Sequence, residues 1–327
     1  MTLKHLSPRA TAASPVFIDF DDAYQAIGWG DAIQALEDHL IDGFEPEDDI
    51  ARIRHSFGNA EYMNMPSIGD RYLGTKLLTL VPDNPSSGRP FIQGVFVLFD
   101  RDTGKVLSSI DGIALTNIRT AAVTALAIKH LRRVKTHRLV VFGSGIQSQE
   151  HIKAICATVE VTEVVIVGRS VERAAQLAKA LARVAPLVRV GIEGDVADAD
   201  IVVCATTAVS PLFDGNLVAD HAIVASVGSH TASSRETDDS LVSRAQIYVE
   251  SHSSAAREAG DIVIPMSQGI IRASGIATLR DLVTGSHHVP TSGPLFFKST
   301  GMSWEDLAVA SVIYEFYNGS VENLGGL

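Results

Sequence analysis

The sequence has little cysteine and no long apolar run, and each shortage excludes a class of protein. Cys156 and Cys204 are the only cysteines among 327 residues, too few for a disulfide-stapled extracellular scaffold, so we expect a reducing, cytoplasmic location. No uncharged apolar run reaches the roughly 20 residues of a transmembrane helix. The stretch from Met1 to Pro15 lacks the apolar core of a secretory signal and reads as a loose lead-in. We therefore expect no membrane partner.

Basic side chains are also in the minority. The chain carries 27 Lys and Arg against 38 Asp and Glu, a formal net charge of −11. A surface of that sign repels phosphate backbones, so nucleic acid is not an expected partner. Hydrophobic residues make up 46% of the chain and charged residues 20%, which is typical of a folded globular protein. The length predicts two domains.

The first third of the chain changes from a helical to an extended pattern. Residues 21–44 have apolar positions at helical spacing. Segments 74–81, 92–99 and 105–110 are separated by turn residues and predict an antiparallel meander. The helix that follows ends near Leu131, and Thr116 is its predicted N-cap. That cap places Arg119 in the first turn, where a cation opposes the helix dipole and a bound carboxylate would explain it.

Beyond residue 136 short apolar strands alternate with helical segments such as 171–185. This rhythm predicts a parallel sheet with right-handed crossovers, hence an α/β fold. The chain closes with a predicted helix over 303–318, with Ser303 as its cap. The expected strands are 138–142, 163–167, 200–204, 222–227 and 246–250.

A glycine loop follows the first of these strands. It reads Gly143-Ser-Gly-Ile-Gln-Ser148 and opens a helix, the context that a dinucleotide site requires. Gly143 allows the tight turn, Gly145 lets a pyrophosphate approach the backbone, and Ser148 is small enough for close helix–strand packing. The free N–H groups of the helix would hold the phosphates. The alternative is a glycine-rich turn without a ligand.

The end of the second strand distinguishes the two nicotinamide cofactors. An acidic residue there would bind the ribose 2′-hydroxyl of NAD. This chain has Arg169 and Ser170, with Arg173 one turn later, and these groups suit a 2′-phosphate. The sequence therefore favours NADP(H), with NAD(H) as the alternative.

Three longer stretches together resemble the ornithine cyclodeaminase/mu-crystallin family. With the glycine loop, the resemblance covers roughly residues 25–319. It implies a Rossmann-type dinucleotide domain, residues 128–298, inserted into an α+β substrate and dimerisation domain, residues 1–127 plus 299–327. It also implies a homodimer. The matching stretches are Lys76-Leu-Leu-Thr-Leu-Val-Pro-Asp-Asn84, Asp102-Thr-Gly with Asp111-Gly-Ile-Ala-Leu-Thr-Asn-Ile-Arg-Thr-Ala-Ala122, and Phe297-Lys-Ser-Thr-Gly-Met-Ser-Trp-Glu-Asp306.

The resemblance also implies the substrate site. Arg54, Lys76 and Arg119 match the family's basic substrate-binding positions, and Met65 matches a residue that shapes the pocket. Arg52 stands two residues before Arg54 and is an alternative ligand. An inward Lys76 needs a partner in an apolar strand, whereas strand alternation alone would equally allow an outward one. In the implied chemistry Lys76 orients the substrate or relays a proton.

The remaining family positions surround the cofactor. The turn from Lys298 to Gly301 is expected to close over it where the chain leaves the nucleotide domain. The implied cofactor-binding residues are Thr120, Gly143, Gly145, Ile146, Gln147, Arg169, Ser170, Arg173, Thr206, Thr207, Val227, Lys298, Ser299 and Gly301.

One loop departs from the deaminating members of the family. They place an aspartate after the fourth predicted strand, whereas this chain has His230 there, a candidate acid near neutral pH. A histidine bonded to backbone is the alternative. His287 and His288 lack a third ligand, so no metal is expected. The favoured function is NAD(P)H-dependent reduction of the C=N bond of a small cyclic or acyclic α-imino acid. Ornithine cyclodeamination, amino-acid dehydrogenation and low-turnover ligand binding remain the alternatives.

Overall fold

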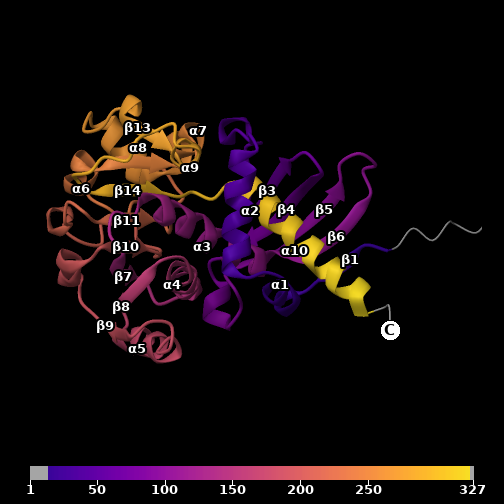
Figure 1. Cartoon of the computed structure of the whole chain (residues 1–327), viewed down its shortest axis with the longest axis horizontal. Coiled ribbons are helices and arrows are strands. Elements are labelled where there is room, and N and C mark those ends of the chain that lie inside the picture. Colours follow the sequence, from indigo (N-terminus) through magenta and orange to yellow (C-terminus); the bar gives the residue numbers. More distant parts are fainter. Residues whose placement is uncertain (1–13, 325–327) are drawn as a thin grey trace, which may run out of the picture.

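The structure is a computed structural model that describes residues 14–324. The lead-in expected up to Pro15 lies almost wholly outside the described residues. Figure 1 shows two layered halves side by side. The half that contains the six-stranded sheet is called the small-sheet half, and the half that contains the eight-stranded sheet is called the large-sheet half. The α/β fold class predicted from the sequence is confirmed. No helix within residues 14–324 is long and apolar enough to cross a membrane.

The small-sheet half contains six strands in the order β1-β6-β5-β4-β3-β2. The predicted meander is confirmed, because β2 to β6 pair sequentially and antiparallel. The pattern did not single out β2 and β3, which extend the meander, or β1, which adds parallel to β6 at the edge. The strands are β1 (Val16–Ile18), β2 (Ile53–Phe57), β3 (Ala60–Ile68), β4 (Tyr72–Leu80), β5 (Ile92–Asp100) and β6 (Val106–Asp111).

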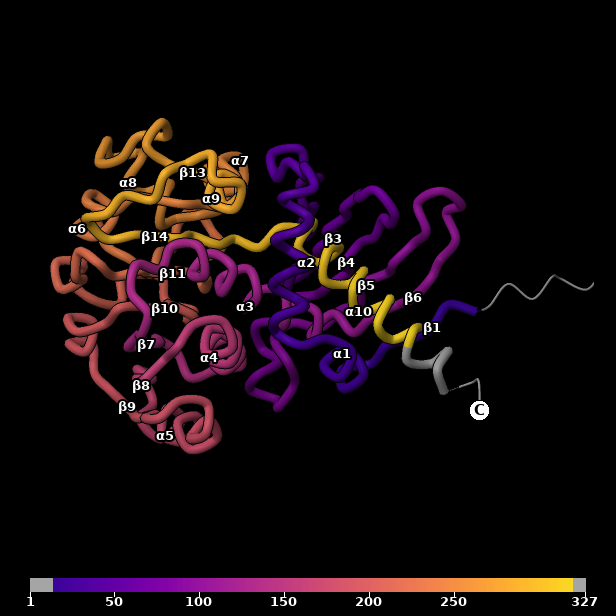
Figure 2. Tube along the Cα trace, in the orientation of Figure 1, coloured from indigo at the N-terminus to yellow at the C-terminus, as the bar shows by residue number. Residues whose placement is uncertain are grey.

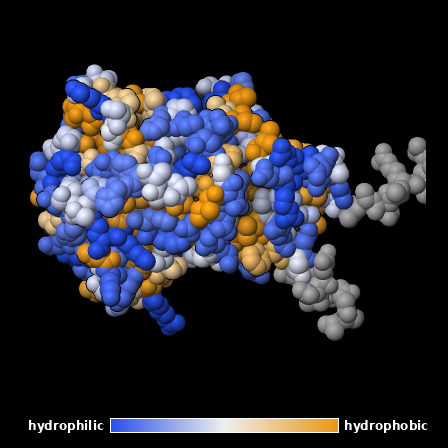
Figure 3. Space-filling model, turned by 45° about the horizontal axis from the view of Figure 1, so that its top comes forward, coloured by the Kyte–Doolittle hydropathy of each residue, from blue (hydrophilic) through white to orange (hydrophobic). Residues whose placement is uncertain are grey.

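Among the residues that the structure describes, the helices cover one face of this sheet. The expected helix over 21–44 is two helices, α1 (Phe20–Ala26) and α2 (Trp29–Ile41), because the chain turns to extended backbone at Ile27. Helix α10 (Ser303–Leu324) returns from the far end of the chain and packs on β3, β4 and β5. Figure 2 shows α10 lying along the sheet beside α2. The other face keeps partly exposed apolar side chains such as Val97, and Figure 3 shows apolar residues on the surface of this half.

Helix α3 (Gly112–Leu131) corrects the expected cap. Its N-cap is Asp111, whose Oδ1 accepts the N–H groups of Ile113 and Ala114, both at 2.9 Å. The Thr116 hydroxyl instead donates to the Gly112 carbonyl within the helix. The prediction of Thr116 as N-cap is wrong because β6 runs directly into the helix. Arg119 therefore lies about two turns into the helix, and the predicted place in the first turn, where it would oppose the dipole, is wrong.

The large-sheet half contains eight parallel strands in the order β13-β12-β14-β11-β10-β7-β8-β9. All five predicted strands are present, and the pattern did not predict β9, β13 and β14. The short β14 lies between β11 and β12 and carries the chain back toward α10. The strands are β7 (Thr136–Phe142), β8 (Glu160–Val167), β9 (Leu187–Val190), β10 (Ile201–Cys204), β11 (Ile223–Ser226), β12 (Gln246–Val249), β13 (Ile276–Thr278) and β14 (Leu295–Lys298).

Two connections join the halves, namely α3 on the way out and the segment from β14 to α10 on the way back. The large-sheet half is thus inserted into the small-sheet half, as Figure 1 shows. The expected division between residues 127 and 128 falls inside α3, near its end. The helices of the large-sheet half are α4 (Ile146–Thr158), α5 (Val171–Ala180), α6 (Asp239–Arg244), α7 (His252–Glu258), α8 (Gly260–Ser267) and α9 (Leu279–Thr284).

Candidate active site

The glycine loop between β7 and α4 has the geometry of a phosphate cradle. Gly143 has φ +120°, and a Cβ at this position would lie 2.5 Å from both the Ala205 carbonyl oxygen and the Ser148 hydroxyl. Gly145 caps α4, and a Cβ there would meet nothing within 4 Å. The space in front of the helix N-terminus is therefore open, and the loop fits the diphosphate of a dinucleotide.

The expected neighbours of this loop lie on both halves of the molecule. Ile146 is 48% exposed at the start of α4. The Gln147 amide donates to Asn117 of α3 at 3.1 Å, which ties the loop to the helix that also carries Arg119. Thr120 donates its hydroxyl back to the Thr116 carbonyl.

Two arginines follow β8 without partners. Arg169 and Arg173 are exposed, and neither guanidinium has a hydrogen bond or ion pair with any other residue among 14–324. Ser170 caps α5 by accepting the Arg173 N–H at 3.2 Å, and its hydroxyl donates to Glu172. The two guanidiniums are thus free to meet an anion at the end of the second strand of the fold.

One buried glutamate, which the sequence analysis missed, organises the loops after β10 and β11. Both the N–H and the hydroxyl of Thr206 donate to Glu236, at 2.9 and 2.7 Å. The Gly228 N–H donates to its other oxygen at 2.8 Å, next to Val227. Burial raises the pKa of Glu236. Thr207 stays exposed beside Thr206.

The turn after β14 is held by the large-sheet half. Glu250 accepts the Ser299 hydroxyl at 2.6 Å and the Gly301 N–H at 2.9 Å. The Lys298 ammonium is buried and donates to Ser226, to the Ser229 carbonyl and to Asp261. All three of its hydrogens are used within the protein, so it supports the 226–229 loop rather than presenting a free charge.

Lys76 and Arg119 meet on buried carboxylates of α10. Lys76 lies in the middle of β4, points inward and is 0% exposed, which settles the alternative of an outward lysine. Its Nζ donates to Asp306 Oδ1 at 2.7 Å, and the same oxygen accepts Arg119 Nε at 3.1 Å. Arg119 Nη1 donates to Glu305 at 2.8 Å. The partner that a buried lysine requires is therefore Asp306.

Burial changes the acid–base behaviour of this cluster. Burial and then the charge of Arg119 lower the pKa of Lys76 to about 8. Burial, followed by the nearby carboxylate of Glu250, raises the pKa of Glu305 well above its usual range. Both shifts follow from removing charged groups from water in the absence of full compensation.

Arg52 approaches the same cluster from the segment before β2. Its Nη2 donates to the Thr300 carbonyl at 3.0 Å and also contacts the Gly301 carbonyl. Gly301 in turn packs against Arg119, because a Cβ on Gly301 would lie 2.3 Å from Arg119 Nη1. Arg52 and Arg119 therefore flank one turn. Met65 is buried in β3 directly opposite Lys76 in the strand register.

Arg54 lies further out than Arg52. Its side chain is 25% exposed, against 9% for Arg52. Both arginines contact Glu258 of α7, and Arg54 also pairs with Glu61 at 3.5 Å. Of the two candidates left open by the sequence, Arg52 is the one that reaches the Lys76 and Arg119 cluster.

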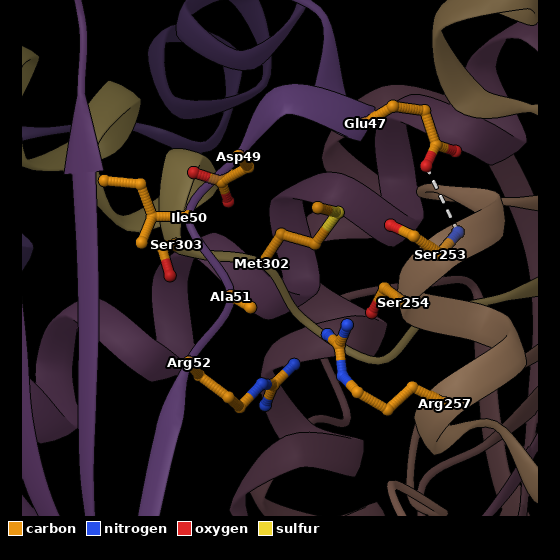
Figure 4. A pocket seen from close by; sticks show the side chains of 10 residues that line it. All are labelled: Glu47, Asp49, Ile50, Ala51, Arg52, Ser253, Ser254, Arg257, Met302 and Ser303. Carbon is orange, nitrogen blue, oxygen red and sulfur yellow. Dashed lines mark hydrogen bonds between the residues drawn. The ribbon is translucent and has the colours of Figure 1, made fainter.

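A cavity of about 170 Å³ borders Arg52 between the two halves. Figure 4 shows the guanidiniums of Arg52 and Arg257 reaching into the same region below Met302. Neither Lys76 nor Arg119 lines this cavity. The cavity therefore reaches the basic cluster only through Arg52.

His230 sits in the loop after β11 with its ring bonded to backbone. Its Nδ1 lies 3.3 Å from the Gly228 carbonyl oxygen, so this nitrogen carries the hydrogen and Nε2 is left as an acceptor. Burial and then the charge of Arg54 lower its pKa. The ring is neutral near pH 7, which does not favour the role of a charged acid. Within residues 14–324 no group of three or more His, Cys, Asp or Glu could hold a metal ion.

Sequence reasoning missed the carboxylates of the site. Glu305 and Asp306 end one of the matched stretches but were given no role in the site, and Glu258 was not considered. The sequence did contain a signal for Glu305 and Asp306, because two adjacent carboxylates at the start of a helix can also pair with a basic side chain from another part of the chain. Glu258 carried no such signal.

Comparison with known proteins finds a matching family and similar sequences. A statistical description of the ornithine cyclodeaminase/mu-crystallin family matches residues 32–320. A Δ1-pyrroline-2-carboxylate reductase of Colwellia psychrerythraea is 32% identical over 77% of this chain and 82% of its own. The rat ketimine reductase mu-crystallin is 31% identical over 77% and 78%.

A solved structure shows the same fold. It is that of Thermococcus litoralis Δ1-pyrroline-2-carboxylate reductase in complex with NADH and L-proline. This structure aligns with a TM-score of 0.88 and 24% identity over 93% of this chain and 98% of the other. The chain belongs to the ornithine cyclodeaminase/mu-crystallin family.

Proposed function

We propose that the protein is an NAD(P)H-dependent reductase of the C=N bond of small α-imino acids, of the Δ1-pyrroline-2-carboxylate or ketimine type. The observation that carries the proposal is the buried cluster of Lys76, Arg52 and Arg119, of which Arg119 lies on α3, the helix that also contacts the glycine loop. The reductase names of the relatives support it. Acyclic imino acids fit the same chemistry.

The charges of the cluster favour a bound carboxylate. Asp306 offers one negative charge to two cations, and the raised pKa of Glu305 means that this carboxyl resists ionising beside them. A substrate carboxylate would supply the missing anion to Arg52 and Arg119 through planar, charge-assisted hydrogen bonds.

The nicotinamide cofactor would supply the hydride that reduces the imine carbon. Arg52 and Arg119 would fix the carboxylate, and thereby the position of the adjacent C=N bond. Lys76, with its pKa lowered to about 8, would donate a hydrogen bond or a proton to the imine nitrogen. Met65 would form the apolar wall beside it, and Arg54 and His230 would line the outer rim.

Cyclodeamination is less well supported than reduction. The residue at the position of the family's catalytic aspartate is His230, and the nearby Glu236 is fully engaged by Thr206, Ser226 and Gly228. No free carboxylate among the described residues of this loop is placed to handle protons at a substrate amine.

The test is NADPH and NADH oxidation by the purified protein with a panel of cyclic and acyclic imino acids. Reduction of at least one imino acid is expected, with no release of ammonia from ornithine. Ammonia release would support cyclodeamination instead. Cofactor binding without turnover of any imino acid would favour a ligand-binding role.

A nicotinamide dinucleotide fits the glycine loop, and we further propose a preference for NADP(H). The free guanidiniums of Arg169 and Arg173 stand where NAD-specific sites place a carboxylate. Ser170, which caps α5, would lie beside the same phosphate. The turn from Lys298 to Gly301 and the loops at Thr206, Thr207 and Val227 would close around the nicotinamide end.

We also propose a cytoplasmic homodimer with a nucleotide domain at 128–298 and a substrate domain formed by the two ends of the chain. Support for the dimer comes from the outer face of the small sheet, where Leu77, Val95 and Val97 are adjacent and only partly buried. Light scattering should give twice the chain mass, and Val97→Lys should yield monomers. A monomeric wild type would contradict the dimer.

A further inference from the structure

Glu258 crosses from the large-sheet half to the arginines of the small-sheet half. It is the last residue of α7, and its side chain is 9% exposed. One oxygen, Oε2, lies 3.2 Å from Arg52 Nε and 3.2 Å from Arg54 Nη2. Its other oxygen accepts Arg257 Nε at 2.8 Å. A single carboxylate thus holds two guanidiniums that stand two residues apart and would otherwise repel each other.

These contacts occupy one side of the Arg52 guanidinium. Nε is taken by Glu258, and Nη2 by the carbonyls of Thr300 and Gly301. Nη1 has no hydrogen-bond partner among residues 14–324. Arg119 shows the same arrangement, because its Nε and Nη1 are held by Asp306 and Glu305 while Nη2 is without a partner in the described chain.

We propose that Glu258 is a positioning residue for the substrate carboxylate. It fixes Arg52 from the opposite half of the molecule so that Nη1 of Arg52 and Nη2 of Arg119 are left to bind the carboxylate. The proposal rests on the function proposed above and adds a condition to it. The carboxylate clamp is complete only when the nucleotide-binding half lies against the small-sheet half.

A neighbouring contact provides a matched control. Glu47 also crosses between the halves, where it accepts the N–H groups of His252 and Ser253 at the start of α7. It has no hydrogen bond or ion pair with an arginine of the described chain. Glu47→Gln therefore changes a contact between the halves at the same helix without altering the contacts of Arg52.

The experiment compares Glu258→Gln, Glu47→Gln and wild type. Binding of L-proline in the presence of cofactor is measured by titration calorimetry. Turnover is measured with Δ1-pyrroline-2-carboxylate and with Δ1-pyrroline, which lacks the carboxylate. A hydrogen bond to a charged group corresponds to roughly a tenfold to hundredfold effect.

We expect Glu258→Gln to raise the Kd for L-proline and the KM for the imino acid by about tenfold or more. The value of kcat should change much less, because the carboxylate contact is made in the ground state and the transition state alike. The preference for the acid over Δ1-pyrroline should fall by the same factor. Cofactor affinity and the behaviour of Glu47→Gln should stay within about twofold of wild type.

Three results would overturn the proposal. They are wild-type affinity for L-proline in Glu258→Gln, equal losses in Glu258→Gln and Glu47→Gln, and a wild type that does not bind L-proline at all. Failure of the proposed function gives a different pattern. In that case L-proline binds in a manner that depends on Glu258, yet no imino acid is reduced, and the positioning role stands.

Discussion

Replacing Arg119 with Ala should destabilise the empty protein. The side chain is 8% exposed and pairs with Glu305 at 2.8 Å and with Asp306 at 3.1 Å. Removing it leaves two buried carboxyls with Lys76 as the one remaining cation that the structure pairs with them. A first-turn arginine, as the sequence predicted, would instead have cost stability, so its removal would have been harmless.

The expected loss follows from the burial of the pair. Deleting one partner of a buried ion pair costs ~3–5 kcal/mol. Glu305 can relieve part of this by taking up a proton, because its pKa is already raised, so we expect the lower end, about 3 kcal/mol. Unfolding entropy of ~2.1 cal/mol/K per residue over 327 residues converts this to a Tm decrease of about 4 °C.

The assay is thermal and urea unfolding of Arg119→Ala and wild type at pH 8 and pH 5. When the pKa of a carboxyl is higher in the folded than in the unfolded chain, the folded protein loses stability as the pH rises from the unfolded pKa to the folded pKa. The deficit of the variant should therefore be larger at pH 8 than at pH 5. Arg173→Ala removes an exposed guanidinium without a partner in the described chain and should stay within about 0.5 kcal/mol of wild type.

Equal stability of Arg119→Ala and wild type at both pH values would refute this reasoning. It would mean that Glu305 and Asp306 do not depend on the guanidinium, and that the side chain serves only the substrate. Adding Glu305→Gln to Arg119→Ala should recover part of the loss, since it removes one uncompensated carboxyl.

Three further predictions concern the site. The value of kcat/KM should fall as the pH rises above about 8 because the Lys76 ammonium loses its proton, and Lys76→Arg should move this decline to higher pH. Gly301→Ala should weaken substrate binding far more than Gly88→Ala. Both glycines have a similar positive φ, +73° and +71°, but only a Cβ on Gly301 would lie 2.3 Å from Arg119 Nη1, whereas Gly88 faces open space. Equal KM values for the two variants would contradict the contact between Gly301 and Arg119. Arg169→Ala should reduce NADPH affinity about tenfold to hundredfold and leave NADH nearly unchanged; equal losses for both cofactors would remove the basis for NADP preference.

The sequence by itself determined the parts of this protein whose signals are local. Alternation of short apolar strands and helices predicts the parallel sheet, and it is there. The need for a tight turn and open backbone predicts the roles of Gly143 and Gly145, and the structure shows a positive φ at the first and free space at the second. The inward position of Lys76 was undecided, because alternation along a strand does not say which face is covered.

The tertiary structure decided which charges meet. Lys76, Arg119 and Asp306 are separated by 43 or more positions along the chain, and no local pattern pairs them. Glu258 reaches Arg52 only because α7 and the segment before β2 pack across the junction of the two halves. The cap of α3 was misjudged for a related reason. Thr116 and Asp111 are both good caps, and the choice depends on where β6 leaves the sheet, which is set by its long-range pairing with β1 and β5.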